Sequence, residues 1–186
     1  MTTATDTGFM EMRLGKVVGV TTEQDDPCCF LVLDGVSEDR HLPIQIGRTE
    51  AFNLSATLTG LDFPRPMSPL FAAGLLRAVG GWVRQVRIDR LEPALGGGTA
   101  YGATVEVESA SGVALVDARP SDAVNLALAA GVPIRVDSDL FEVEAGKKAM
   151  ARAAASPVTA DLVAEQRRRY EAAARLPCSD PETSET

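Results

Sequence analysis

Residues 117–134 read DARPSDAVNLALAAGVPI and combine a strand end, a turn and a helix. The apolar residues 113–118 predict a strand that runs into this segment. Pro120 disfavours helical geometry at the residue before it, so the predicted helix covers 121–130 and ends at Gly131. The sequence therefore predicts a strand-to-helix corner that carries two aspartates and an arginine within an apolar segment.

These charged residues suggest one kind of chemistry. Asp117 would end the strand and Asp122 would lie in the first helical turn, so both carboxylates can approach one point that Arg119 borders. Glu50, at the start of the first predicted helix, is a third candidate acid. Carboxylate oxygens hold Mg²⁺ or Mn²⁺, and a guanidinium can grip a phosphate with two hydrogen bonds. The sequence thus admits metal-assisted phosphodiester cleavage, with Asp117, Asp122 and Glu50 as metal ligands and Arg119 as a phosphate ligand.

The same residues have a structural interpretation. An acid in the first turn of a helix complements the free N–H groups there, and Arg119 can pair with Asp122. Asp117 shares strand parity with apolar residues, so it is expected to face inward and to need Arg119 or Arg65 as a partner. Arg65 lies between two prolines on a stiff segment that can aim it at the same cleft as a second phosphate ligand, or it can cap a helix or pair with an acid. Both interpretations stay open at this point.

The other elements predict an α+β domain with a mixed, largely antiparallel sheet of about six to eight strands. The predicted strands cover residues 10–20, 28–33, 42–46, 82–88, 101–107, 113–118 and 134–136, and predicted helices start near Thr49, Ser68, and Asp137 or Ser138. The first three strands are expected to form an antiparallel meander with a turn at residues 25–27. Ser68 is expected to cap its helix ahead of Pro69.

The expected domain organisation has four parts. Residues 1–9 are expected to be a flexible N-terminus, and residues 10–150 the compact domain. Residues 151–176 read as a C-terminal helical extension with a basic end, and residues 177–186 as a disordered acidic tail.

Composition limits the function further. The net charge of -8 opposes general attraction to phosphate backbones, so DNA or RNA would have to bind through a local arginine patch. Three cysteines without CxxC spacing and a single histidine argue against disulfide frameworks and multi-histidine zinc sites. His41 alternates onto the polar face of its strand and is expected to be solvent-exposed. No run approaches the roughly 18 apolar residues of a membrane span, and the first residues lack a signal pattern, so we expect a cytoplasmic protein.

The glycines at 96–98 do not indicate a nucleotide-binding loop. No Gly-Lys-Ser/Thr follows them, and both flanks read as strands. A hairpin loop is the better interpretation.

Three segments resemble the bifunctional nuclease domain family of bacteria and plants. Residues 42–47, LPIQIG, with Glu50-Ala51 match the family's strand and helix start, Arg65-Pro66 matches its central Arg-Pro, and residues 117–128 with Pro133-Ile134 follow its most specific segment. The matched segments span roughly residues 10–145. The resemblance implies a mixed α/β domain that forms dimers or higher homo-oligomers, and some members degrade DNA and RNA.

One departure from the family pattern concerns activity. The family usually has Thr-His-Asp-Leu after Arg-Pro-Leu, whereas Pro69 and Leu70 stand at the histidine and aspartate positions here. The resemblance therefore implies a divergent, metal-dependent nuclease, while this departure favours a non-catalytic oligomeric or regulatory module on the same fold. A binder of small anions or nucleotides that uses the same arginines is a third hypothesis.

Overall fold

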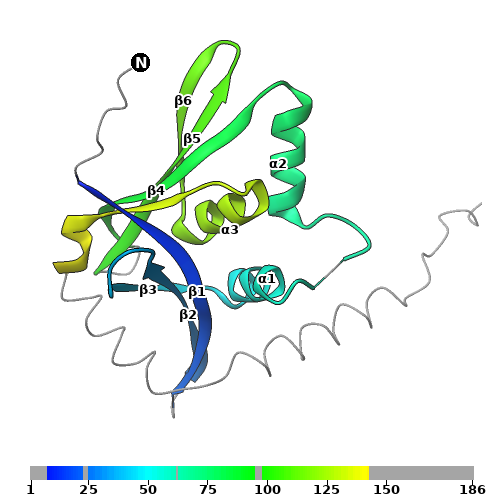
Figure 1. The fold of residues 1–186 in the computed structure, drawn as a ribbon. Coiled ribbons are helices and arrows are strands. Elements are labelled where there is room, and N and C mark those ends of the chain that lie inside the picture. The colour runs from blue at the N-terminus through cyan, green and yellow to red at the C-terminus, as the bar shows by residue number, and fades with distance from the viewer. Residues whose placement is uncertain (1–7, 23–24, 62, 95–97, 143–186) are drawn as a thin grey trace, which may run out of the picture.

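The computed structural model describes residues 8–22, 25–61, 63–94 and 98–142, which form one α+β domain (Figure 1). The strands are β1 (Phe9–Thr22), β2 (Asp25–Gly35), β3 (His41–Ile46), β4 (Trp82–Pro93), β5 (Thr99–Ser109), β6 (Gly112–Ala118) and β7 (Ile134–Asp137). The helices are α1 (Arg48–Leu58), α2 (Ser68–Ala78), α3 (Pro120–Ala130) and the 3₁₀ helix η1 (Ser138–Glu142). The predicted fold class is confirmed.

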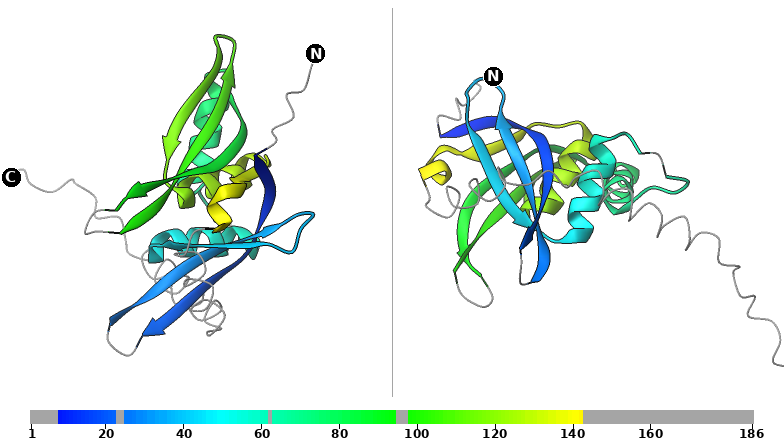
Figure 2. Two further views of the ribbon diagram at one scale, coloured as in Figure 1. Left: turned by 90° about the vertical axis from the view of Figure 1, so that its left-hand side faces the viewer. Right: turned by 90° about the horizontal axis from the view of Figure 1, so that it is seen from below.

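The strands form one seven-stranded sheet in the order β3-β2-β1-β7-β4-β5-β6. Its two antiparallel meanders, β1–β3 and β4–β6, are joined by β7, which pairs antiparallel with β1 and parallel with β4. Figure 2 shows the meanders as two arms of one twisted sheet. The expected meander of the first three strands is confirmed, and β3 and β6 are the edge strands.

The core lies between the sheet and helices α1 and α3. Figure 1 shows α1, α2 and α3 gathered on one side of the sheet. Leu54 of α1 and Val124 of α3 are fully buried against sheet residues such as Val86 and Ile88. Ala73 is the buried residue of α2, and the larger apolar residues Phe71 and Leu75 of that helix are exposed. Packing of α1 and α3 therefore fixes the positions of their first turns, where the acidic residues lie.

Some local predictions are wrong. Residues 25–27 belong to β2 rather than to a turn, because β1 and β2 stay paired as far as Thr22 and Asp25. Ser68 is the first residue of α2 and makes no cap, since Met67 takes the capping position without a side-chain hydrogen bond. A 3₁₀ helix replaces the α-helix predicted after Asp137 as far as Glu142.

Several expectations fall outside the described residues. These are residues 1–7 of the predicted flexible N-terminus 1–9, whose Phe9 lies in β1, the end of the compact domain beyond Glu142, the helical extension 151–176 and the acidic tail 177–186. Within the described part, His41 is exposed, as predicted, and its ring pairs with Asp34 and Asp39. No helix there has the length and apolar character that a bilayer crossing requires.

Candidate functional site

Arg119 joins the first turns of α1 and α3. Its Nη1 lies 2.8 Å from Glu50 Oε1, and its Nε and Nη2 donate to the two carboxylate oxygens of Asp122 at 2.7 and 3.1 Å. Arg119 is the N-cap of α3, and its extended backbone, φ -71° and ψ 148°, is the geometry that Pro120 imposes on it. We call Arg119, Glu50 and Asp122 the Arg119 cluster. The predicted pairing of Arg119 with Asp122 is present.

The Arg119 cluster is charged and open to solvent. The hydrogen bonds to Asp122 and then to Glu50 raise the pKa of Arg119 above its usual value, so the guanidinium stays charged. The side chains of Arg119, Asp122 and Glu50 are 65%, 53% and 19% exposed. Because exposed ion pairs are weak, a ligand can compete for any of these groups.

Gly47 makes room for Glu50. It is the N-cap of α1, and a Cβ added there would overlap the Glu50 carboxylate. Glu50 lies in the first turn of the helix, where a negative charge is favourable. The LPIQIG segment thus ends in a glycine that lets the acid fold back toward Arg119.

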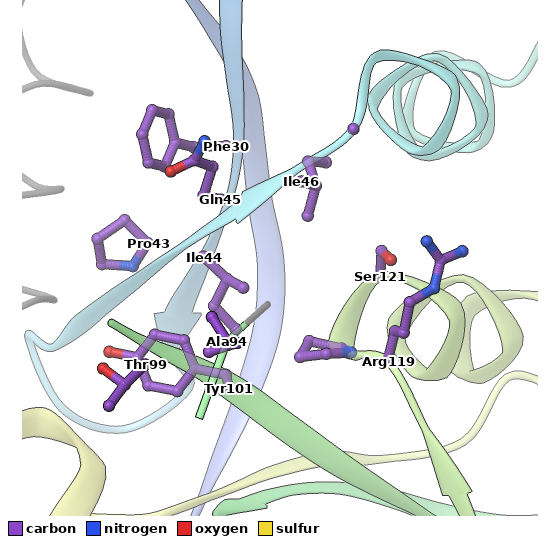
Figure 3. A pocket seen from close by; sticks show the side chains of 13 residues that line it. Phe30, Pro43, Ile44, Gln45, Ile46, Ala94, Thr99, Tyr101, Arg119 and Ser121 are labelled. Atoms are coloured by element: carbon purple, nitrogen blue, oxygen red, sulfur yellow. The ribbon is translucent and has the colours of Figure 1, made fainter. Parts of the chain in front are cut away.

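A pocket of about 670 Å³ lies beside the cluster, between β3, β5 and the start of α3; we call it the sheet pocket. Figure 3 shows Tyr101 and Pro43 on one side and Ser121 and Arg119 on the other. Apolar residues such as Phe30 supply much of the wall. The volume is in the range of small-molecule sites. Its polar groups come from the start of α3 and from β3 and β5.

Two hydroxyl groups of the sheet pocket can serve a ligand. Tyr101 Oη is buried and has no hydrogen-bond partner among the described residues, and burial raises the pKa of Tyr101. Ser121 is buried in the first turn of α3 and also lines the pocket. Since buried hydroxyls are rarely left without partners, Tyr101 is available to donate to a bound molecule.

Asp117 does not join this cluster, so its expected convergence with Asp122 is wrong. Its carboxylate is 84% exposed and pairs with Nη2 of Arg90, and it lines a separate shallow pocket with Arg90 and Leu115. The expectation that Asp117 faces inward and pairs with Arg119 or Arg65 is also wrong.

Strand alternation explains the position of Asp117. In the β5–β6 ladder Asp117 is opposite Thr104, whereas Ala118 is opposite the buried Ala103. Neighbouring residues of a strand point to opposite faces, so Asp117 lies on the face away from the helices. The chain then turns into α3 at Arg119, which brings Asp122 to the other side of the sheet.

The carboxylates that meet at Arg119 are therefore Glu50 and Asp122. Among the described residues, no three His, Cys, Asp or Glu side chains form a group that could hold a metal ion. The roles of Asp117, Asp122 and Glu50 as metal ligands stay predictions.

Arg65 is exposed on the segment between α1 and α2. Its neighbours in the chain, Phe63 and Met67, line a second pocket, which lies among the helices. Arg65 itself lines neither that pocket nor the sheet pocket. Its role as a phosphate ligand also stays a prediction.

Sequence reasoning missed Gly47, Tyr101 and Ser121 as site residues. One signal was available for Tyr101, because it alternates in phase with the buried Ala103 and Val105 of β5. A phenol on a buried face needs a partner. Gly47 carried a weaker signal, as the glycine directly before a predicted helix.

Comparison with known proteins supports one family. The sequence model of the bifunctional nuclease domain matches residues 31–149. An uncharacterized protein of Mycobacterium tuberculosis strain CDC 1551 / Oshkosh is 36% identical over 122 residues, which is 66% of this chain and 70% of the relative. An uncharacterized protein of strain ATCC 25618 / H37Rv matches with the same identity and coverage.

Proposed function

Because this chain belongs to the bifunctional nuclease domain family, we propose that it binds the phosphodiester backbone of DNA or RNA in the cytoplasm and hydrolyses it with a divalent cation. The observation that carries the proposal is the Arg119 cluster, an exposed guanidinium and two carboxylates beside a pocket of about 670 Å³. A local cation of this kind can bind a phosphate despite the net charge of -8.

The donor set of the cluster suits a hard divalent cation. Glu50 and Asp122 already share one cation, the guanidinium of Arg119, and carboxylate oxygens are the preferred ligands of Mg²⁺ and Mn²⁺. We expect these two residues to hold the ion, whereas Asp117, paired with Arg90 on the opposite face of the sheet, would not reach it. The ion would polarise a phosphoryl oxygen and lower the pKa of a bound water.

The remaining residues would bind and orient the strand. When a cation competes for Glu50 and Asp122, Arg119 is free to donate two hydrogen bonds to the non-bridging oxygens of a phosphate. The guanidinium then stabilises the charge that develops on the phosphate as water attacks and the P–O bond breaks. Tyr101 can donate to a sugar or phosphate oxygen, and Arg65 can bind a neighbouring phosphate.

A cleavage assay tests this function. Labelled single- and double-stranded DNA and RNA are incubated with the protein and Mg²⁺ or Mn²⁺, beside the variants Asp122→Asn and Glu50→Gln. We expect each variant to lose at least about tenfold in rate, with Glu38→Gln, an exposed acid remote from the cluster, as the matched control. Asp117→Asn should cut at about the wild-type rate, because its carboxylate lies on the other face of the sheet. Intact substrates, or an Asp122→Asn variant that cuts at the wild-type rate, would overturn the proposed hydrolysis.

A second candidate function is a non-catalytic homo-oligomeric module. It is favoured by β6, an edge strand whose Val113, Leu115 and Val116 are all exposed. Antiparallel pairing of β6 with β6 of a second copy would continue the sheet and cover these side chains.

Light scattering coupled to gel filtration tests this assembly. We expect a dimer that Leu115→Lys converts to a monomer, with Leu58→Lys on α1 as the control for an exposed leucine elsewhere. A wild-type monomer would remove this candidate.

A further inference from the structure

A second pocket, of about 480 Å³, lies where α1, α2 and α3 meet; we call it the helix pocket. Its wall is mostly apolar, with Ala56 from α1, Leu70 from α2, Leu128 from α3, and Phe63 from the segment between α1 and α2. A pocket of this size with a mostly apolar wall is typical of small-molecule sites. The proposed phosphodiester chemistry does not use the helix pocket.

One buried polar group faces the helix pocket without a partner. Asn125 of α3 is 3% exposed and lines the pocket, and its Oδ1 has no hydrogen-bond partner among the described residues. A buried carbonyl oxygen without a donor destabilises the folded protein, and nearly all such groups in proteins are satisfied. The site therefore offers an acceptor to a ligand that carries an N–H or O–H group.

The helix pocket lies next to the Arg119 cluster. Asn125 follows Asp122 by three positions on α3, and Asn53 follows Glu50 by three positions on α1. Residues three apart are neighbours on one helix face, so the pocket begins about one turn, ~5 Å, beyond the cluster. A phosphate at Arg119 would thus have the helix pocket within the reach of its own nucleotide.

The two residues that depart from the family pattern lie in the wall of the helix pocket. Pro69 and Leu70, which stand where the family usually has histidine and aspartate, both line it. This side is therefore apolar in the present chain and suits the face of a ring rather than a charged group. Phe63 is held edge-on against Phe52, with ring centroids 6.0 Å apart, and offers an aromatic surface for stacking.

We propose that the helix pocket is a base subsite, which takes a nucleobase with an exocyclic amino group from a strand whose phosphate binds at Arg119. This inference rests on the proposed function, which supplies the strand. The amino group of cytosine or adenine would donate to Asn125 Oδ1. Thymine and uracil present a carbonyl oxygen at the corresponding position, which would face the acceptor without a hydrogen.

A binding experiment without metal tests the subsite. Fluorescence anisotropy with labelled oligo(dC) and oligo(dT), in EDTA so that no strand is cut, gives the affinity of each pyrimidine strand. We expect the wild type to prefer oligo(dC) by about tenfold, the value of one well-formed hydrogen bond. Asn125→Leu should abolish this preference. It should also raise the melting temperature, because it replaces a buried acceptor that has no partner by an apolar group of similar size.

A matched control separates burial from recognition. Ser55 of α1 also has a buried oxygen without a partner among the described residues, but it does not line the helix pocket. Ser55→Ala should therefore keep the preference for oligo(dC). If Asn125→Leu instead lowers the melting temperature strongly, Asn125 is a structural residue and the inference is wrong.

The outcomes distinguish the subsite from the proposed function. Equal affinity of the wild type for oligo(dC) and oligo(dT), or a preference that survives in Asn125→Leu, overturns the subsite. The function still stands in that case if Arg119→Ala weakens the binding of both strands. If the wild type binds no strand, the proposed function fails. The pocket is then tested alone with free cytidine and uridine, and a melting shift with cytidine that Asn125→Leu does not remove would overturn it.

Discussion

Arg119 and Arg90 lie on opposite faces of the sheet, and each pairs with one acid of residues 117–122. Arg119 pairs with Asp122, and Arg90 pairs with Asp117. Arg90 lies over Gly102, and its guanidinium bonds to Glu92, Asp89, Thr104 and Asp117 on three neighbouring strands. The hydrogen bonds to Glu92 and then to Asp89 raise the pKa of Arg90. Arg119 instead connects two helix starts and is twice as exposed, at 65% against 32%.

The difference separates a structural arginine from one suited to a ligand. The guanidinium of Arg90 lines a shallow pocket on the open face of the sheet but is occupied by protein groups, so a phosphate would have to displace several of them. Arg119 lines a pocket, and its two partners are themselves candidate metal ligands. The predictions below test whether binding depends on Arg119 and sheet stability on Arg90.

The largest expected effect is on nucleic-acid affinity. Arg119→Ala should weaken the binding of a short single-stranded oligonucleotide by at least about tenfold, because a charge-assisted, bidentate hydrogen bond to a phosphate is lost. The slope of log affinity against log salt concentration should also fall by about one, the value expected for the loss of one phosphate contact. Arg90→Ala should change the affinity by less than about twofold. Anisotropy titrations over a salt series measure both quantities, and equal losses in the two variants would contradict the assignment.

A smaller effect is expected on stability, where a change that disturbs Arg90 should cost more than one that disturbs the Arg119 cluster. A Cβ at Gly102 would lie 2.8 Å from Cγ and Nε of Arg90, so Gly102→Ala should push this side chain off its partners. We expect a loss of about 1 kcal/mol, or roughly 2–4 °C in melting temperature. Gly47→Ala should displace Glu50 from Arg119 and cost less, because that ion pair is exposed and alanine stiffens the unfolded chain.

Calorimetry on both glycine variants measures this order. Gly8→Ala serves as the control, since a Cβ there meets no atom within 4 Å. A larger loss of stability for Gly47→Ala than for Gly102→Ala would mean that the Arg119 cluster mainly stabilises the fold, as the structural interpretation of the corner supposes.

The same comparison shows what the sequence could predict about the fold. The apolar runs of β2 and β6 look alike, yet Leu31 of β2 is fully buried and Leu115 of β6 is 62% exposed. β2 has a neighbour on each side, whereas β6 is an edge strand. Periodicity shows which residues of a strand share a face, but neither which face is buried nor the order of strands in a sheet. It therefore predicted both strands and wrongly turned Asp117 inward.

The site was predictable where it is local. Arg119 and Asp122 are three residues apart across a helix start that Pro120 fixes, and their pairing follows from that spacing. Glu50 was also placed near them, as an acid at the start of another helix. The sheet pocket and the helix pocket depend on how α1, α3 and β5 pack together. The alternation of β5 could mark Tyr101 as a phenol on a buried face, but neither Tyr101 nor Asn125 could be placed in a pocket from the sequence.

The smallest expected effect concerns Tyr101, whose side chain alternates with Gly102 and so faces the sheet pocket rather than Arg90. Burial raises the pKa of Tyr101 in the folded protein, while a tyrosine in the unfolded chain ionises near pH ~10. Its neutral form thus contributes stability below about pH 10, and this contribution is lost as the pH rises toward the raised folded value. Tyr101→Phe should remove that part of the alkaline decline in melting temperature.

Ultraviolet titration of the phenolate band measures the pKa of Tyr101 directly, with the Tyr101→Phe variant identifying its step. A phosphodiester in the sheet pocket adds negative charge and excludes water, so binding of a single strand should raise the pKa of Tyr101 further. Arg119→Ala should abolish this additional rise because the strand is lost, whereas Arg90→Ala should leave it in place. If the pKa of Tyr101 does not change when the nucleic acid binds, the phosphate lies outside the sheet pocket, and the structure gives Arg119 no advantage over Arg90 as its ligand.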